Sequence, residues 1–273
     1  MRADDDGDDD ATAGTQLHHP RLAEIVAGQL RERIVLGELV DGSRLPKQDD
    51  LLREFRVSRQ SLREALRILE SEGLLSIQRG NVGGAIVRAP RAQSSAYMFG
   101  LVMRSRHVAL GDLAEAIRAV EPVAASLCAR RADRMQAVVP ELRRLHEGAR
   151  VSTGDGVELT GWARRFHEVM VQLCGNETLI LMLGTLELMW SHQEQAWAEQ
   201  AEQKGRYPAG PARQDVLSAH AAILKAIERG DEDRAARLAR DHLRASQRYA
   251  LAEGGATVVH AVPPRETPDR GLS

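Results

Sequence analysis

The sequence predicts a mainly α-helical protein, in which three short helices and a small β-hairpin precede an all-helical bundle. Three observations predict this fold class. Apolar residues recur at i, i+3, i+4 and i+7 along most of the chain. Two short apolar segments flank a glycine-rich turn within residues 74–90, as in a β-hairpin. No convincing strand pattern occurs between residues 98 and 252.

The N-terminal helices and the hairpin follow from local signals. A helix beginning near Pro20 ends at Gly37, and a short helix is expected over residues 48–55. Ser58 is a good N-cap for a third helix, which ends at Gly73. One face of that helix is apolar, through Leu62, Ala65, Leu66 and Leu69. The hairpin turn is expected around residues 79–81.

The bundle is expected to contain six helices, separated by glycine- and proline-containing breaks. They are predicted at residues 112–132, 136–149, 157–174, 177–202, 212–229 and 232–252. Residues 88–97 have the composition of a linker. The chain therefore divides into an acidic tail, a helix-and-hairpin domain, a linker, the bundle and a loose C-terminal tail. These segments are residues 1–18, 19–90, 91–109, 110–254 and 255–273.

Composition excludes several classes of protein. The chain has 273 residues, 43% hydrophobic and 28% charged, which is typical of a globular protein. Only 3% of residues are aromatic, which argues against a stacking platform for single-stranded nucleic acid. There is no apolar run of 18 residues and no signal peptide, and Cys128 and Cys174 suit a reducing compartment. We expect a cytoplasmic protein without membrane contact.

The N-terminal domain has the pattern of a winged helix-turn-helix. Its two short helices meet at a tight turn and a hairpin follows, so the second of them is expected to enter the major groove of DNA. Arg59, Gln60 and Arg63 lie on the exposed side of its first turns. Arginine can pair with guanine edges and glutamine with adenine. For Arg67, further along, an ion pair with Glu64 is the favoured reading.

These residues resemble the GntR family of bacterial transcription regulators. The resemblance implies that Arg59, Gln60, Ser61 and Arg63 contact DNA and that Arg79-Gly80, at the wing tip, reaches the minor groove. The matching positions are Leu45-Pro46, Leu51, Phe55, Val57-Ser58-Arg59, Leu62 to Leu66, Leu69-Glu70, Gly73-Leu74-Leu75 and Arg79-Gly80.

One position departs from the family pattern. Asp49 stands where the family usually has an arginine that touches phosphate. A carboxylate there should repel the DNA backbone, and Lys47 is expected to take over the phosphate contact. The acidic tail is either a solubilising segment or a competitor of DNA for the basic face of the domain.

Three histidines in the bundle suggest a metal site. His167 lies on the apolar face of its helix, and His220 and His242 lie on two helices joined by a tight turn. Three imidazoles from three helices suit a divalent metal such as zinc, although a single histidine on an apolar face is more often a core residue. No organic cofactor is expected.

The bundle is similar to the FCD effector domain attached to many FadR-type GntR proteins. The matching pieces are Arg118 to Pro122, Phe166-His167, Gly175-Asn176, His220 and Gly230-Asp231 to His242. The family pattern adds an aspartate four residues before the first histidine, where this chain has Ala163. Either three histidines hold the metal with water or an effector carboxylate, or the site has lost its metal and binds something else.

The effector itself is open between several classes. Arg118 could pair with an effector carboxylate, or instead with Glu115 or Glu121 on its own helix. A stripe of large apolar side chains lines either a core or a ligand pocket. It consists of Met182, Met189, Leu183, Leu186 and Trp190. An organic acid, a fatty acid and an acyl-CoA are all compatible with these residues.

The leading functional prediction is a ligand-responsive transcription regulator, in the commoner case a repressor, that binds a palindromic DNA operator as a homodimer. It is not expected to be an enzyme. The alternative is a metal-dependent hydrolase using the three-histidine site, but Glu168, the nearest general base, lies about 100° round the helix from His167. An architectural DNA-binding protein without an effector is disfavoured by the size of the bundle.

Overall fold

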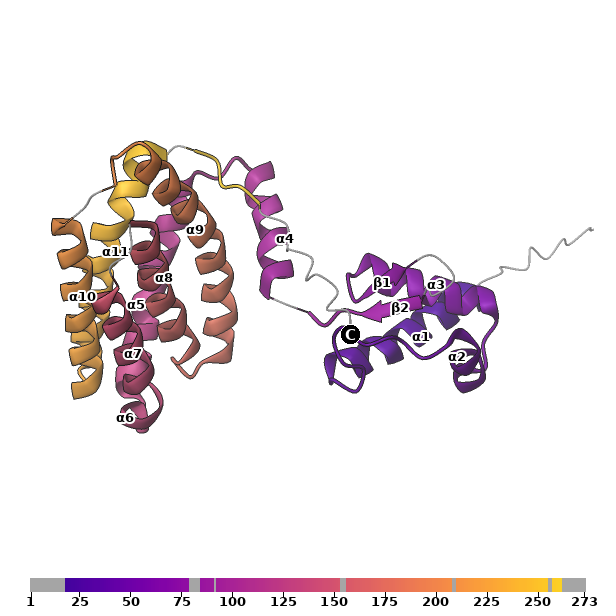
Figure 1. Ribbon diagram of the computed structural model, residues 1–273. Helices are drawn as coiled ribbons and strands as arrows, with labels where there is room; N and C mark the ends of the chain where they lie inside the picture. The colour runs from indigo at the N-terminus through magenta and orange to yellow at the C-terminus, as the bar shows by residue number, and fades with distance from the viewer. Residues whose placement is uncertain are drawn as a thin grey trace, which may run out of the picture. The chain divides into compact units, whose positions relative to one another are not determined.

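The computed structural model describes residues 18–78, 84–90, 92–152, 156–207, 210–254 and 257–261. It divides the chain into two compact units, residues 1–90 and residues 91–273 (Figure 1).

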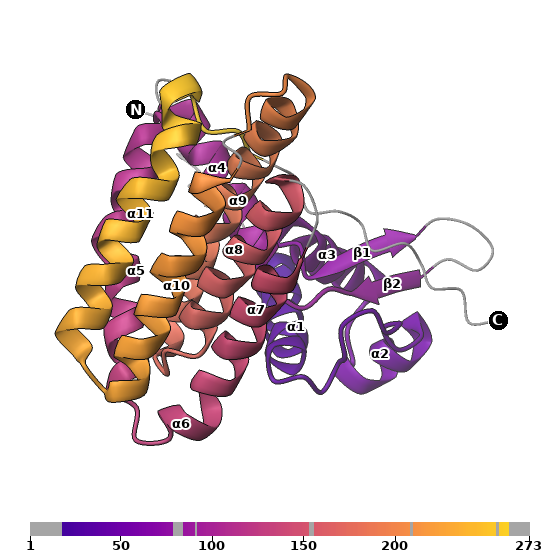
Figure 2. The same cartoon turned by 60° about the vertical axis from the view of Figure 1, so that its left-hand side comes forward.

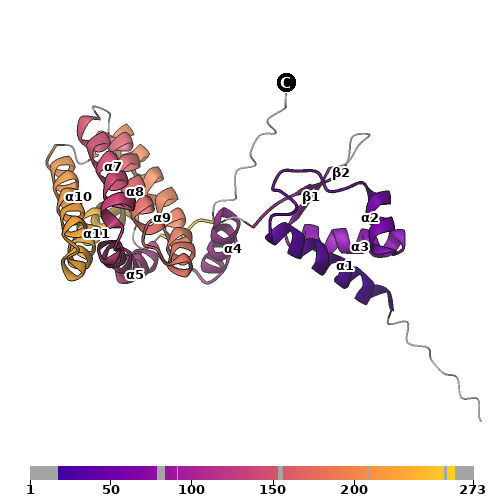
Figure 3. The same cartoon turned by 90° about the horizontal axis from the view of Figure 1, so that it is seen from below.

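The N-terminal unit contains three helices and one hairpin. Its elements are α1 (His18–Val35), α2 (Gln48–Phe55), α3 (Arg59–Ser71), β1 (Leu75–Gln78) and β2 (Gly84–Val87). Helices α1 and α3 pack on each other, and β1 packs on α3 (Figure 3). Leu30, Leu51, Leu62 and Leu69 are among the side chains that are fully buried in its core. The apolar face predicted for the third helix is therefore its buried face.

Short-range contacts fix the turn between α2 and α3. Arg56 caps α2 in the left-handed conformation, with φ at 53°. The hydroxyl of Ser58 accepts a hydrogen bond from the backbone N–H of Ser61 at 3.1 Å, which caps α3 as predicted. The two helices thus meet with only three residues between them.

The hairpin is antiparallel, with Leu75 opposite Val87 and Gln78 opposite Gly84. Arg44 bridges to Ile86 on the far side of β2, so the loop after α1 extends the small sheet. The predicted wing tip, Arg79-Gly80, lies outside the described residues.

The C-terminal unit is helical throughout its described part, apart from short connections and the segment at residues 257–261. Helices α5, α10 and α11 run side by side along one face (Figure 2). The elements are α4 (Ala92–Ser105), α5 (Leu110–Arg130), α6 (Arg134–Ala137), α7 (Val139–Val151), α8 (Gly156–Gln172), α9 (Glu177–Gln203), α10 (Pro211–Arg229) and α11 (Glu232–Gly254). No helix among those described is both long and apolar enough to cross a membrane.

Two segments differ from the sequence-based expectation. A linker was expected over residues 91–109, but residues 92–105 form α4, which packs on α9 through the buried Ala96 and Met103. A loose tail was expected after Gly254, but the backbone of Val259 donates a hydrogen bond to Val108 and its side chain is fully buried. Both segments owe their order to contacts with residues that are distant in sequence.

Candidate metal centre and nucleic-acid interface

The start of α3 presents a polar surface in the N-terminal unit. Arg59, Gln60 and Arg63 are exposed, whereas Ser61 is buried and its hydroxyl hydrogen-bonds that of Ser58. Ser61 therefore packs inside the domain. Lys47 is exposed immediately before α2.

The arginines of α3 differ in their partners. Arg59 pairs with Asp49 of α2, with Nη2 and Oδ1 3.1 Å apart. Arg67 pairs with Glu64 at 3.5 Å, as predicted. Arg63 has no ion-pair partner among the described residues, which leaves its guanidinium available to an outside partner.

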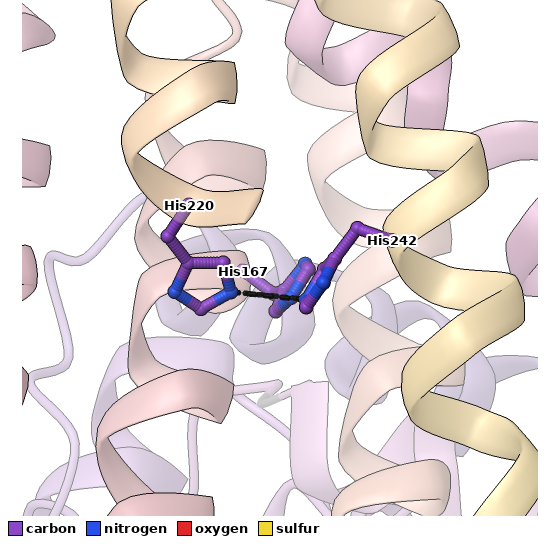
Figure 4. Close-up of side chains that lie close together, drawn as sticks. All are labelled: His167, His220 and His242. Carbon is purple, nitrogen blue, oxygen red and sulfur yellow. Dashed lines mark hydrogen bonds between the residues drawn. The ribbon is translucent and has the colours of Figure 1, made fainter. Parts of the chain in front are cut away.

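The three histidines of the C-terminal unit converge from three helices. His167 lies on α8, His220 on α10 and His242 on α11, and all three are buried. Their Nε2 atoms form a triangle: 3.0 Å from His220 to His242, 3.1 Å from His242 to His167 and 3.3 Å from His220 to His167. Figure 4 shows the three rings turned toward one another. The antiparallel pairing of α10 and α11, joined at Gly230, creates this proximity as predicted.

Neighbouring side chains orient the rings. The Nδ1 of His167 lies 2.6 Å from Glu121 Oε1 on α5, an arrangement that places the ring proton on Nδ1 and leaves the Nε2 lone pair free. The ring of Phe166 stacks on His220, with centroids 4.1 Å apart. Burial lowers the pKa of His242 to about 3, and burial lowers the pKa of His220 as well. Burial lowers the pKa of His167 in the same way, which favours the neutral imidazole form that binds metal at all three positions.

This triangle fits a divalent metal. Nitrogen ligands at about 2.0–2.1 Å from a tetrahedral zinc ion lie about 3.3 Å from each other. The observed separations of 3.0–3.3 Å are close to that value. Within the described residues these three histidines form a group able to hold a metal. Ala163, one turn before His167, lines the adjoining cavity, so the missing aspartate would face the site.

The predicted family is shown by comparison with known proteins. Residues 22–83 match the family described as bacterial regulatory proteins, gntR family, and residues 112–245 match the FCD domain. The chain belongs to the GntR family.

Individual relatives agree with this assignment. The chain is 37% identical over 87 residues to the HTH-type transcriptional repressor NanR of Klebsiella aerogenes, a match covering 29% of this chain and 34% of NanR. It is 29% identical over 229 residues to the Escherichia coli (strain K12) protein that is named as regulator of the L-lactate dehydrogenase operon, covering 82% and 84%. A solved structure of a Streptococcus agalactiae GntR protein covers 83% of this chain and 99% of that one, with a TM-score of 0.60 at 20% identity, which shows a shared fold.

The GntR assignment decides between the predicted classes. The matched families and relatives are regulators of transcription rather than enzymes, and the hydrolase alternative has no support among them. Glu168, the nearest general base for that alternative, forms ion pairs with Arg164 at 3.4 Å and with Arg165 at 3.0 Å.

Sequence reasoning missed the acidic groups beside the histidines of this GntR regulator. Glu121 and Glu187 are both buried, and their carboxyl groups lie close enough to act on each other's pKa. Glu187 and Glu194 line the cavity that His167 and His242 also line. Burial raises the pKa of Glu121 and of Glu194 to about 7, and burial raises that of Glu187 well above its ordinary value.

A signal for these glutamates was present in the sequence. Glu187, Trp190, Glu194 and Trp197 are spaced i, i+3, i+7 and i+10, so they share one face of α9, and all four line the cavity. Arg118, the predicted effector ligand, instead donates a hydrogen bond to Gln247 at 3.0 Å. It lines a separate depression, with Glu115, Ala119, Arg240 and Arg244.

Proposed function

We propose that this chain is an effector-responsive repressor that binds a palindromic operator as a homodimer. The observation that carries the DNA-binding part is the exposed row of Arg59, Gln60 and Arg63 on the first turns of α3, in a domain of the GntR family. In a helix-turn-helix these turns reach base edges in the major groove. Lys47 supplies a phosphate contact at the start of α2.

The homodimer is supported by exposed apolar surface on α4. Met98, Phe99 and Val102 are 61%, 45% and 51% exposed, although large apolar side chains are usually covered when they cluster. A second copy of the chain would bury them and set two DNA-binding units against the two halves of a palindrome. Repression is proposed because the relative NanR is named as a transcriptional repressor.

The effector is a small organic acid that binds beside the three histidines. His167, His220 and His242 would hold a divalent metal such as zinc, which offers an open position to an effector oxygen. One relative is named as regulator of the L-lactate dehydrogenase operon, whose enzyme acts on a small organic acid. The cavity beside the histidines has a volume of about 70 Å³, which favours a small effector over a fatty acid or an acyl-CoA.

Two measurements test this function. The purified chain is incubated with random DNA, and the retained sequences are expected to contain a palindrome. Size-exclusion chromatography of the protein is expected to give the mass of two chains. Candidate acids and acyl-CoAs are then added to the shifted complex, and small acids are expected to release it. Absence of a shifted band on any selected palindrome overturns the proposal.

The metal is tested separately, on protein purified without an affinity tag. Elemental analysis is expected to find about one divalent ion per chain, and His220→Ala should remove it. Stoichiometric metal that survives this substitution would place the ion elsewhere.

A further inference from the structure

The cavity beside the histidines has an acidic wall, which disfavours the binding of a ligand whose only charged group is a carboxylate. Glu187 and Glu194 line it, and among its described lining residues Arg164 is the only arginine or lysine. Arg164 is already engaged, because it pairs with Glu168 at 3.4 Å and donates to Gln195. The wall therefore offers two carboxyl groups to a ligand and one arginine that is partly neutralised.

Among the described residues, neither glutamate forms an ion pair with a lysine or arginine, although the charge of Arg164 lowers the pKa of Glu194. Glu187 is 5% exposed, and no donor among the described residues reaches its Oε1. Burial raises the pKa of both carboxyls, as expected where carboxyl groups are enclosed without adequate positive charge.

Aromatic rings complete this wall. Trp190, Trp197, Tyr207 and Tyr249 line the same cavity. The ring of Trp197 lies 5.6 Å from that of Tyr207 and 6.2 Å from that of Tyr249, between centroids. Aromatic faces attract organic cations, and carboxyl groups beside them strengthen that attraction.

A second depression leads to the same residues from between α10 and α11. It shares Val216, His242, Ser246 and Tyr249 with the cavity and adds Asp215 and Asp241. Its arginine, Arg248, lies over the Tyr249 ring at 4.8 Å. This route also exposes a ligand to more carboxyl groups than cations.

We propose that the effector carries an ammonium group in addition to its acid group. This inference rests on the proposed function, since it describes the molecule that fills the same site. The ammonium group binds Glu187 and Glu194 against the aromatic wall, and the acid group faces the histidines and Arg164. The cavity beside the histidines has a volume of about 70 Å³, which favours an effector with a short backbone.

Matched small molecules test the proposal by calorimetry on the full-length, zinc-loaded chain in the absence of DNA. The probes are butanoate, butylamine, and 2-, 3- and 4-aminobutanoate, which vary the charge at nearly constant size. At least one aminobutanoate is expected to bind about tenfold more tightly than butanoate and butylamine. Hydrogen bonds to charged groups contribute enough for Glu194→Gln and Glu187→Gln each to weaken that isomer about tenfold to a hundredfold.

Glu199→Gln is the matched control, because Glu199 is exposed on α9 and does not line the cavity. Its affinity for the same isomer should be unchanged. If butanoate binds as tightly as every aminobutanoate, the proposed ammonium group of the effector is wrong, but the proposal of an acid effector still stands. Failure of all the probes, from protein that still shifts its selected DNA, would overturn this inference but not the DNA-binding function. Aminobutanoate binding that both cavity variants leave unchanged would also overturn it.

Discussion

At position 163 the chain has a methyl group where the FCD pattern has a metal-binding carboxylate, and this methyl group lines the cavity one turn from His167. Ala163→Asp should therefore supply a fourth ligand and tighten zinc binding by about tenfold or more. Competition with a chromophoric chelator measures the change. Ala163→Asn, which adds similar bulk without a charge, should have a much smaller effect. Equal zinc affinity in the aspartate variant and the parent chain would contradict the proposed position of the metal.

Glu194 makes stability depend on pH. Burial raises its pKa in the folded chain to about 7 from an ordinary 4.5, so its contribution to stability is present below about pH 4.5 and is lost as pH rises to 7. Glu194→Gln removes this loss. The variant should be more stable than the parent at pH 8 and should show no gain at pH 4.5, in urea unfolding of metal-free protein. An equal gain at both values of pH would show that charge is not the cause.

We expect Asp49 to affect DNA binding through its ion pair with Arg59 as well as through repulsion of phosphate. Their ion pair is exposed on both sides, so it contributes at most about 1 kcal/mol and DNA can displace it. Asp49→Arg should raise DNA affinity, and the slope of log affinity against log salt concentration should steepen by about the value of one added phosphate contact. Asp49→Asn should release Arg59 without that steeper slope. Filter binding at several salt concentrations measures both, and unchanged or poorer affinity of the arginine variant at moderate salt would refute this role.

At the scale of elements, the segment at residues 257–261 packs into the core of the C-terminal unit. Val259 is fully buried in the cluster that contains Trp190 and Leu113. Val259→Ala should cost about 1–3 kcal/mol of stability, through lost burial and a small cavity. Val151→Ala is the control, because Val151 is 64% exposed at the end of α7. Denaturant unfolding compares the two, and equal effects would mean that the segment does not pack as described.

Elements set by local signals were predictable from the sequence, and those set by distant contacts were not. Helix α3 has its cap at Ser58, its apolar face and its stop at Gly73 within one short stretch. Helix α4 has exposed Met98 and Phe99 and only weak local signals, and its order depends on packing against α9. The tail segment depends in the same way on Val108.

The candidate site follows the same division. The histidines were predictable because His220 and His242 lie on helices joined at Gly230 and because the set resembles the FCD pattern. Glu187 and Glu194 were missed because glutamates are ordinarily read as solvent-facing, even within an apolar stripe. Their spacing with Trp190 and Trp197 places them on the buried face of α9, but only the packed bundle shows that this face borders the histidines.

At the scale of the whole molecule, an effector can act on DNA binding only if it binds the DNA-competent and incompetent states with different affinity. Coupling of this kind is reciprocal: if the effector weakens operator binding by some factor, the operator must weaken effector binding by the same factor. Factors of about 5 to 150 are typical of such coupling.

This reciprocity gives a prediction that does not depend on the identity of the operator. Calorimetry measures the dissociation constant of the effector with and without a saturating concentration of the selected palindrome. The palindrome should raise this constant by some factor. The effector should raise the dissociation constant of the palindrome by the same factor. Scrambled DNA at the same concentration should leave effector affinity unchanged. A Glu194→Gln chain, which retains the surface of α3, should bind the palindrome normally and respond to the effector only at higher concentration. Effector affinity that is indifferent to the palindrome would mean that the cavity and the DNA-binding unit are not linked.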